Sequence, residues 1–225
     1  MAGEKTESSD RSGLTSLQTK VLRAFFERER GFFVTGGAAL VGFYLHHRLT
    51  DDLDLFTVDE DAFERGPHVV VELGNDLGAR LDVRQDAPGF KRYALTFADG
   101  SLVVDLVLDR APQIFAQKSE RDGVLVDPLA EILANKLTAL VGRAEERDLV
   151  DVLFIERAGH PVEDALAAAL AKDGGCTAAT LAWVLSEWAI PDGVLLPGDV
   201  SAVELREFSA DLVKRLRRAA ASQRG

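Results

Sequence analysis

The hydrophobic pattern of the chain changes near residue 127. Before that point, short apolar or alternating runs predict strands at residues 32–35, 53–58, 81–84, 93–97 and 102–108. Helical spacing predicts a first helix around Leu17 to Phe25, a second at 38–47, and a third with Pro67 in its first turn. The dipeptide Asp99-Gly100 predicts a hairpin between the last two strands. This part is expected to be an α+β unit, a small mixed sheet flanked by helices.

From Pro128 onward the pattern is helical throughout. Clusters of Gly, Pro and Asp separate predicted helices at residues 128–142, 147–158, 162–172, 177–188 and 203–220. We therefore expect a polar, disordered leader at 1–13, a sheet-bearing domain at 14–127 and an all-helical domain at 128–225.

Composition limits the class of protein to which this chain can belong and its cellular location. Of the 225 residues, 47% are hydrophobic, which is enough for a core, and no apolar run approaches the roughly 20 residues needed to span a bilayer. The first residues do not resemble a signal peptide, and a single cysteine, Cys176, excludes an internal disulfide. We expect a cytoplasmic protein with no membrane partner.

The net charge of -11 excludes general attraction to nucleic acid, so a polynucleotide would need a local basic patch. Residues 205–225 hold six basic side chains against two acidic ones. This segment is either a solvated last helix with cations at its C-terminal end or a surface that contacts RNA.

A glycine pair and an acid pair are the most informative feature. Gly36-Gly37 separates an apolar run from a helix-like run, and Asp52 and Asp54 open the next expected strand. Side chains two apart on a strand point the same way, so the two acids would share one face. Backbone amides at a helix start bind phosphate, and carboxylate oxygens bind Mg²⁺. The segment predicts a site for a metal-bound triphosphate, with nearby Arg48 as a further candidate for binding it.

A third carboxylate interrupts an otherwise apolar strand. Asp105 is the only charged residue between Leu102 and Leu108. A carboxylate there needs a partner, and a shared cation is the simplest one. Three acids from two strands could hold two Mg²⁺ ions, and Asp105 is also a candidate general base.

Basic residues in the helical part are candidates for binding the triphosphate. Lys136 falls in the middle of the apolar stripe of its helix. Arg143 and Arg147 lie on the same arc if that helix continues far enough. The alternative is internal ion pairing of these cations with Asp148 and Asp151.

Three segments together resemble the AbiEii/AbiGii family of nucleotidyltransferase toxins from type IV toxin–antitoxin systems. They are FVTGGAALVGFYLHHRLTDDLDLF at 33–56, VVDLVL at 103–108 and ANKLTALVGRAEERDLVDV at 134–152. The resemblance implies a fold related to DNA polymerase β-type nucleotidyltransferases, Mg²⁺ as cofactor, and transfer of NMP from an NTP. It also implies an RNA acceptor, notably the 3′ end of tRNA, and a cognate antitoxin as a possible partner.

The same resemblance assigns roles to individual residues. By motif, the phosphate turn corresponds to Gly36 and Gly37, and the metal ligands correspond to Asp52, Asp54 and Asp105. The later motifs of the family are matched by Lys136, Arg147 and Asp148. The wider superfamily usually has serine at position 37. Glycine there removes a hydroxyl contact to phosphate and leaves the backbone amides.

Two other functions stay open. The acidic net charge suits a transferase that modifies a cationic small molecule such as an aminoglycoside. A non-catalytic binding module is the other, and retention of the three acids and Lys136 argues against it. The chain contains no G-x-x-x-x-G-K-[ST] or G-x-G-x-x-G motif, which argues against P-loop and Rossmann sites.

Overall fold

The computed structural model describes residues 13–222. Residues 1–12 of the expected leader lie outside this range, whereas Gly13 is buried against Val41. Within 13–222, no helix is both long enough and apolar enough to cross a membrane.

A seven-stranded mixed sheet forms the first part of the fold, in the order β3-β4-β5-β2-β1-β7-β6. The strands are β1 (Phe33–Val34), β2 (Asp52–Thr57), β3 (Arg80–Ala87), β4 (Phe90–Phe97), β5 (Gly100–Leu108), β6 (Ser119–Arg121) and β7 (Val124–Val126). Strand β2 pairs in parallel with β5, and β4 pairs antiparallel with β5. The α+β class is confirmed.

Strand alternation decides which side chains face the core. On β2, Leu53 and Leu55 are fully buried, whereas Asp52 and Asp54 lie on the opposite face and are only partly buried. On β5, Leu106 lies beside Leu55 in the parallel register. The period of two thus separates the apolar side of the sheet from the side that carries acids.

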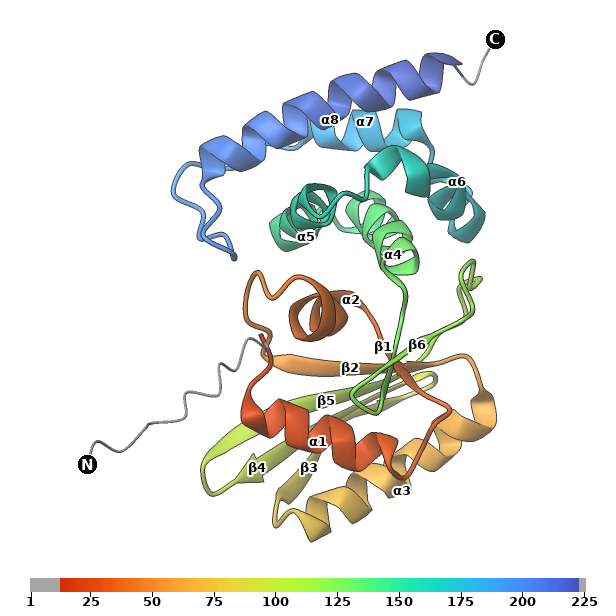
Figure 1. The fold of residues 1–225 in the computed structure, drawn as a ribbon, viewed down its shortest axis with the longest axis vertical. Coiled ribbons are helices and arrows are strands. Elements are labelled where there is room, and N and C mark those ends of the chain that lie inside the picture. The colour runs from red at the N-terminus through yellow and green to blue at the C-terminus, as the bar shows by residue number, and fades with distance from the viewer. Residues whose placement is uncertain (1–12, 223–225) are drawn as a thin grey trace, which may run out of the picture.

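Helices cover both faces of this sheet (Figure 1). Helices α1 (Ser16–Phe26) and α3 (Glu60–Asp76) lie on the apolar face, and α2 (Gly36–Ala39) lies on the other. A capping box fixes the start of α1, where the Thr15 side chain accepts from the backbone of Gln18 and the Gln18 side chain accepts from the backbone of Thr15.

The second part of the chain is a stack of helices beyond α2 (Figure 1). They are α4 (Leu129–Gly142), α5 (Glu146–Arg157), α6 (Val162–Lys172), α7 (Ala178–Glu187) and α8 (Ala202–Ser222). Each agrees with a predicted helix to within two residues. A buried ion pair between Lys172 and Glu131 ties α6 to α4.

The predicted helix at 38–47 is wrong in its end and its type. Helix α2 continues only as a π-helix, η1 (Leu40–Tyr44), in which the Leu45 N–H donates to the Leu40 carbonyl. His46 then takes a positive φ of 50°, and its Nδ1 lies 2.7 Å from the Val41 carbonyl oxygen. This left-handed residue stops the helix before His47.

Three further details differ from the sequence expectations. Pro67 lies inside α3, because Asp59 caps that helix eight positions earlier by accepting from Asp61 and Ala62. The β4–β5 hairpin exists, but its two loop residues are Ala98 and Asp99, since Gly100 already pairs with Phe97. Strands β6 and β7 are too short to give an alternating signal.

The packing of α3 on the sheet gives a testable contrast between two of its glycines. A methyl group on Gly66 would lie 2.8 Å from Leu106 Cδ1 and 2.9 Å from Phe32 Cζ, whereas one on Gly74 would lie 3.4 Å from its nearest neighbour. Gly66→Ala should therefore lower the free energy of unfolding by about 1–3 kcal/mol. Its position before Pro67 adds to the cost.

Gly74→Ala is the matched control and should raise the free energy of unfolding by about 0.5–1 kcal/mol, because alanine loses less backbone entropy in a helix. Urea denaturation of both variants measures the contrast. Equal effects of the two substitutions would contradict this packing.

Candidate active site

Three carboxylates meet at the acid-bearing face of the sheet. Asp54 on β2 lies directly opposite Asp105 on β5, and Asp52 is two residues before Asp54 on the same face. One oxygen from each carboxylate lies within 4.8 Å of the others. The structure therefore brings together the three acids that the sequence suggested as metal ligands.

This donor set fits a hard divalent cation. Magnesium takes oxygen ligands, commonly one or two carboxylates together with waters and substrate phosphates. Asp52 and Asp54 are both partly exposed, so ligands from solvent or substrate can reach the same position. Three carboxylates this close together, without a cation, repel each other.

That repulsion contributes to a raised pKa of Asp54. Burial first, and then the charges of Asp52 and Asp105, raise the pKa of Asp54 from 3.8 to about 6. The charges of Lys136 and Arg92 act in the opposite direction. Asp54 thus lies between an acidic group of residues and a basic one.

Arg92 is a site residue that the sequence analysis missed. It lies on β4 directly opposite Asp105, donating from Nε to Oδ1 at 2.8 Å and from Nη2 to Oδ2 at 2.6 Å. The hydrogen bonds and charge of Asp105 raise the pKa of Arg92 further. Because Asp105 is buried, this two-bond pair supplies the partner that a mid-strand carboxylate requires.

A second cluster, which we call the basic hub, lies across from the acids. It consists of Lys136 on α4, Arg143 at the end of α4, Asp148 and Asp151 on α5, and His47 and Arg48 from the segment before β2. Its centre is Asp151, whose carboxylate is within 2.7 Å of Lys136 Nζ, 2.8 Å of His47 Nε2 and 2.9 Å of Arg48 Nε. Burial alone would raise the pKa of Asp151, but the hydrogen bond from His47 and the charges of Lys136 and Arg48 hold it well below its usual range. Neither His47 nor Asp151 was singled out as a site residue from the sequence.

Lys136 also pairs with the second acid of the hub. Its Nζ lies 2.7 Å from Asp148, which also receives the Arg143 guanidinium at 2.7 Å. Internal ion pairing, the alternative that the sequence left open, is therefore what Lys136 and Arg143 do in this structure.

The expected arc of three cations is wrong for Arg147. Helix α4 ends at Gly142, Ala144 has a positive φ of 48°, and α5 begins at Glu146. Arg147 therefore belongs to a different helix, where it is exposed and pairs with Glu145. It does not join the basic hub.

The glycine turn precedes both clusters in sequence. Gly36 has a positive φ of 59°, and a side chain there would meet nothing within 4 Å. The first amides of the helix that follows have no intrahelical acceptor. The turn thus presents open backbone next to Arg48 of the basic hub.

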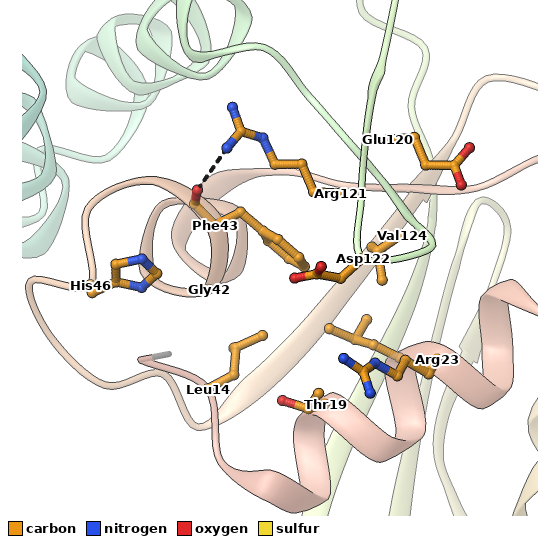
Figure 2. A pocket seen from close by; sticks show the side chains of 11 residues that line it. Leu14, Thr19, Arg23, Gly42, Phe43, His46, Glu120, Arg121, Asp122 and Val124 are labelled. Atoms are coloured by element: carbon orange, nitrogen blue, oxygen red, sulfur yellow. Dashed lines mark hydrogen bonds between the residues drawn. The ribbon is translucent and has the colours of Figure 1, made fainter. Parts of the chain in front are cut away.

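A cavity of about 650 Å³ lies elsewhere, between α1, η1 and the β6–β7 hairpin (Figure 2). Leu14 and Phe43 line it together with Arg23 and Asp122. It contains none of the predicted site residues, so it is separate from the acids and the basic hub.

The comparisons with known proteins agree with this geometry. The family model for the nucleotidyl transferase AbiEii toxin of type IV toxin–antitoxin systems matches residues 20–224. The chain belongs to this family. The resemblance inferred from its motifs is thereby confirmed.

Solved structures extend the likeness to the fold. A candidate nucleotidyltransferase from H. pylori is 17% identical, with 90% of this chain and 94% of that chain covered and a TM-score of 0.54. The protein JHP933 from Helicobacter pylori is also 17% identical, with 92% and 94% covered and a TM-score of 0.53. At this identity they show a shared fold alone. No curated protein matches the chain.

The raised pKa of Asp54 predicts how stability depends on pH in this AbiEii-family chain. An acid whose pKa is higher in the folded state favours folding below its unfolded value of 3.8, and that contribution is lost as the pH rises through about 6. Without divalent ions, Asp54→Asn should therefore be more stable than the wild type at pH 7.5, by about 1–3 kcal/mol. The gain should be clearly smaller at pH 4.5 and should vanish only below the unfolded pKa of 3.8.

Urea denaturation at the two pH values measures this difference. Asp82→Asn, on β3 of the same sheet, is the control for the same chemical change at a carboxylate outside the acid trio. A gain that is the same at both pH values would contradict the shift.

The ion pair of Arg92 with Asp105 gives a second prediction, which concerns the binding of a divalent cation. Arg92→Leu leaves Asp105 buried without a partner, so it should lower the free energy of unfolding by about 2–4 kcal/mol in the absence of divalent ions. Added Mg²⁺ or Mn²⁺ should then raise the melting temperature of this variant more than that of the wild type, because the cation replaces the lost charge.

Arg84→Leu removes an exposed arginine from the neighbouring strand β3 and serves as the control. Thermal melts with and without the cation give the comparison. An equal rise in melting temperature for the wild type and Arg92→Leu would argue that the cation does not replace the charge of Arg92 beside Asp105.

Proposed function

We propose that this chain transfers a nucleoside monophosphate from an NTP to an RNA acceptor, such as the 3′ end of a tRNA. The observation that carries the proposal is the trio Asp52, Asp54 and Asp105, drawn together within 4.8 Å and facing a cluster of buried cations. Carboxylates suit the metal of a metal–triphosphate complex, and cations suit its phosphates.

The proposed reaction is a displacement at the α-phosphorus. The acceptor hydroxyl oxygen bonds to that phosphorus, the bond to the bridging oxygen breaks so that pyrophosphate leaves with its electron pair, and the hydroxyl proton passes to solvent water. Mg²⁺ bound to the three acids would supply a lowered hydroxyl pKa and stabilise the charge on pyrophosphate.

The geometry changes the role we assign to Asp105. The sequence suggested it as a general base, but both of its oxygens accept from Arg92. We therefore assign Asp105 to metal binding with Asp52 and Asp54.

Exposed cations on α8 support an RNA acceptor. Arg206 and Arg215 of this helix are occupied by ion pairs with acidic neighbours. Lys214, Arg217 and Arg218 are exposed and form no ion pair within residues 13–222. Surface cations of this kind bind phosphate and give a salt-dependent affinity.

The test is transfer of label from each of the four α-³²P NTPs, with Mg²⁺, to total RNA or to a mixture of aminoglycosides. Label should appear on RNA, should be abolished by EDTA, and should fall at least a hundredfold in Asp52→Asn and Asp54→Asn, because a lost metal ligand removes several kcal/mol of transition-state stabilisation. Asp82→Asn is the control that should retain activity.

Two outcomes would overturn the proposal. Label on the aminoglycoside and never on RNA would favour the small-molecule transferase, which the net charge of -11 suits. Undiminished transfer by both Asp variants would remove the three acids from the reaction. Lys136 is a poorer first test, because its removal leaves Asp148 and Asp151 buried with fewer partners.

A type IV antitoxin is the proposed protein partner, on the strength of family membership.

A further inference from the structure

The place where a side chain at residue 37 would lie is taken by Arg48. A Cβ atom built on Gly37 would lie 2.5 Å from Arg48 Nη2 and 3.4 Å from Arg48 Cζ. The first of these distances is far below van der Waals contact. Unlike Gly36, Gly37 has no positive φ, so its backbone would accept any residue. Glycine at residue 37 thus leaves room for the guanidinium.

Arg48 cannot easily swing away from this position. It donates from Nε to Asp151 Oδ1 at 2.9 Å, from Nη2 to Asp151 Oδ2 at 3.1 Å, and from Nη1 to the Leu49 carbonyl at 3.0 Å. Its side chain is only 11% exposed. Displacing the guanidinium would take bonds away from a fully buried carboxylate, which is costly.

The held guanidinium still has donors to spare. An arginine has five N–H groups, and within residues 13–222 Arg48 uses three of them, on Nε, Nη1 and Nη2. Burial lowers its pKa, but the bond to Asp151 and the charges of Asp148 and Asp52 raise the pKa above its usual value. A permanent positive charge thus lies at the glycine turn, within electrostatic reach of the acid trio.

We infer that Arg48 binds the triphosphate of the NTP from the position that a side chain at residue 37 would otherwise occupy. Asp151 is the positioning residue that holds the guanidinium there. The inference rests on the proposed function, and it adds that residues 37 and 48 act as a pair: a guanidinium at 48 requires glycine at 37. A merely structural arginine would stabilise the fold without affecting nucleotide affinity.

The pairing is tested by a double-mutant cycle with Gly37→Ala and Arg48→Lys. Lysine keeps a positive charge but lacks the forked end that meets Cβ of residue 37. Affinity for the four α,β-methylene NTP analogues, measured calorimetrically with Mg²⁺, is the readout, and circular dichroism with thermal melts checks folding. Gly142→Ala is the steric control, because a methyl group there meets nothing within 4 Å.

In the wild-type background, Gly37→Ala should weaken analogue binding about tenfold or more, the loss expected when a charged hydrogen-bond donor is displaced. Arg48→Lys should weaken binding several-fold. The double variant should bind like Arg48→Lys alone, so that the added methyl group has no effect once the fork is gone. Should Arg48→Lys not fold, Arg48→Met takes its place in the same cycle.

Three results would overturn the inference. They are unchanged affinity in Gly37→Ala, the same fold-loss from Gly37→Ala in both backgrounds, or a lower melting temperature with unchanged affinity. A wild-type protein that binds none of the four analogues and transfers no label would instead overturn the proposed function itself, which keeps the two failures distinct.

Discussion

One buried carboxylate, Asp151, fixes the geometry on which the candidate site depends. It lies on α5 and binds His47 and Arg48 from the segment before β2, together with Lys136 from α4. Because an unpaired buried charge is so costly, these bonds constrain each other strongly. The helical part of the chain is thereby held in register with the strand that carries the acids.

The site consists of acids on the sheet and the basic hub on the helices, and the charges within each cluster are only partly neutralised. On the sheet, Arg92 offsets only Asp105, so Asp52 and Asp54 keep the repulsion that raises the pKa of Asp54. On the helices, Asp148 and Asp151 offset the cations of the basic hub. A metal–triphosphate complex carries both kinds of charge and can satisfy both surfaces at once. Under the proposed function, this arrangement lets a strongly acidic chain bind a polyanionic substrate.

The sequence predicted those parts of the site that follow from local periodicity. Asp52 and Asp54 had to share a face because strand side chains alternate, and Asp105 had to find a partner because its strand is otherwise apolar. Arg92 could not be found, since its place opposite Asp105 depends on the register of the β4–β5 hairpin. Arg147 was misplaced because the arc assumed that α4 continues past the predicted and observed helix end at residue 142. Long-range pairs such as those of Asp151 have no sequence periodicity at all.

The adjacent glycines show how one motif can combine two unrelated constraints. Gly36 is needed for its backbone, because its φ of 59° strains any residue with a Cβ, while space around it is open. Gly37 is needed for its lack of a side chain, because Arg48 already fills that volume. In the sequence alone, both glycines suggest the same feature, a phosphate-binding turn at a helix start. The structure shows that the second depends on a side chain eleven residues away, so residue 37 can vary only together with residue 48.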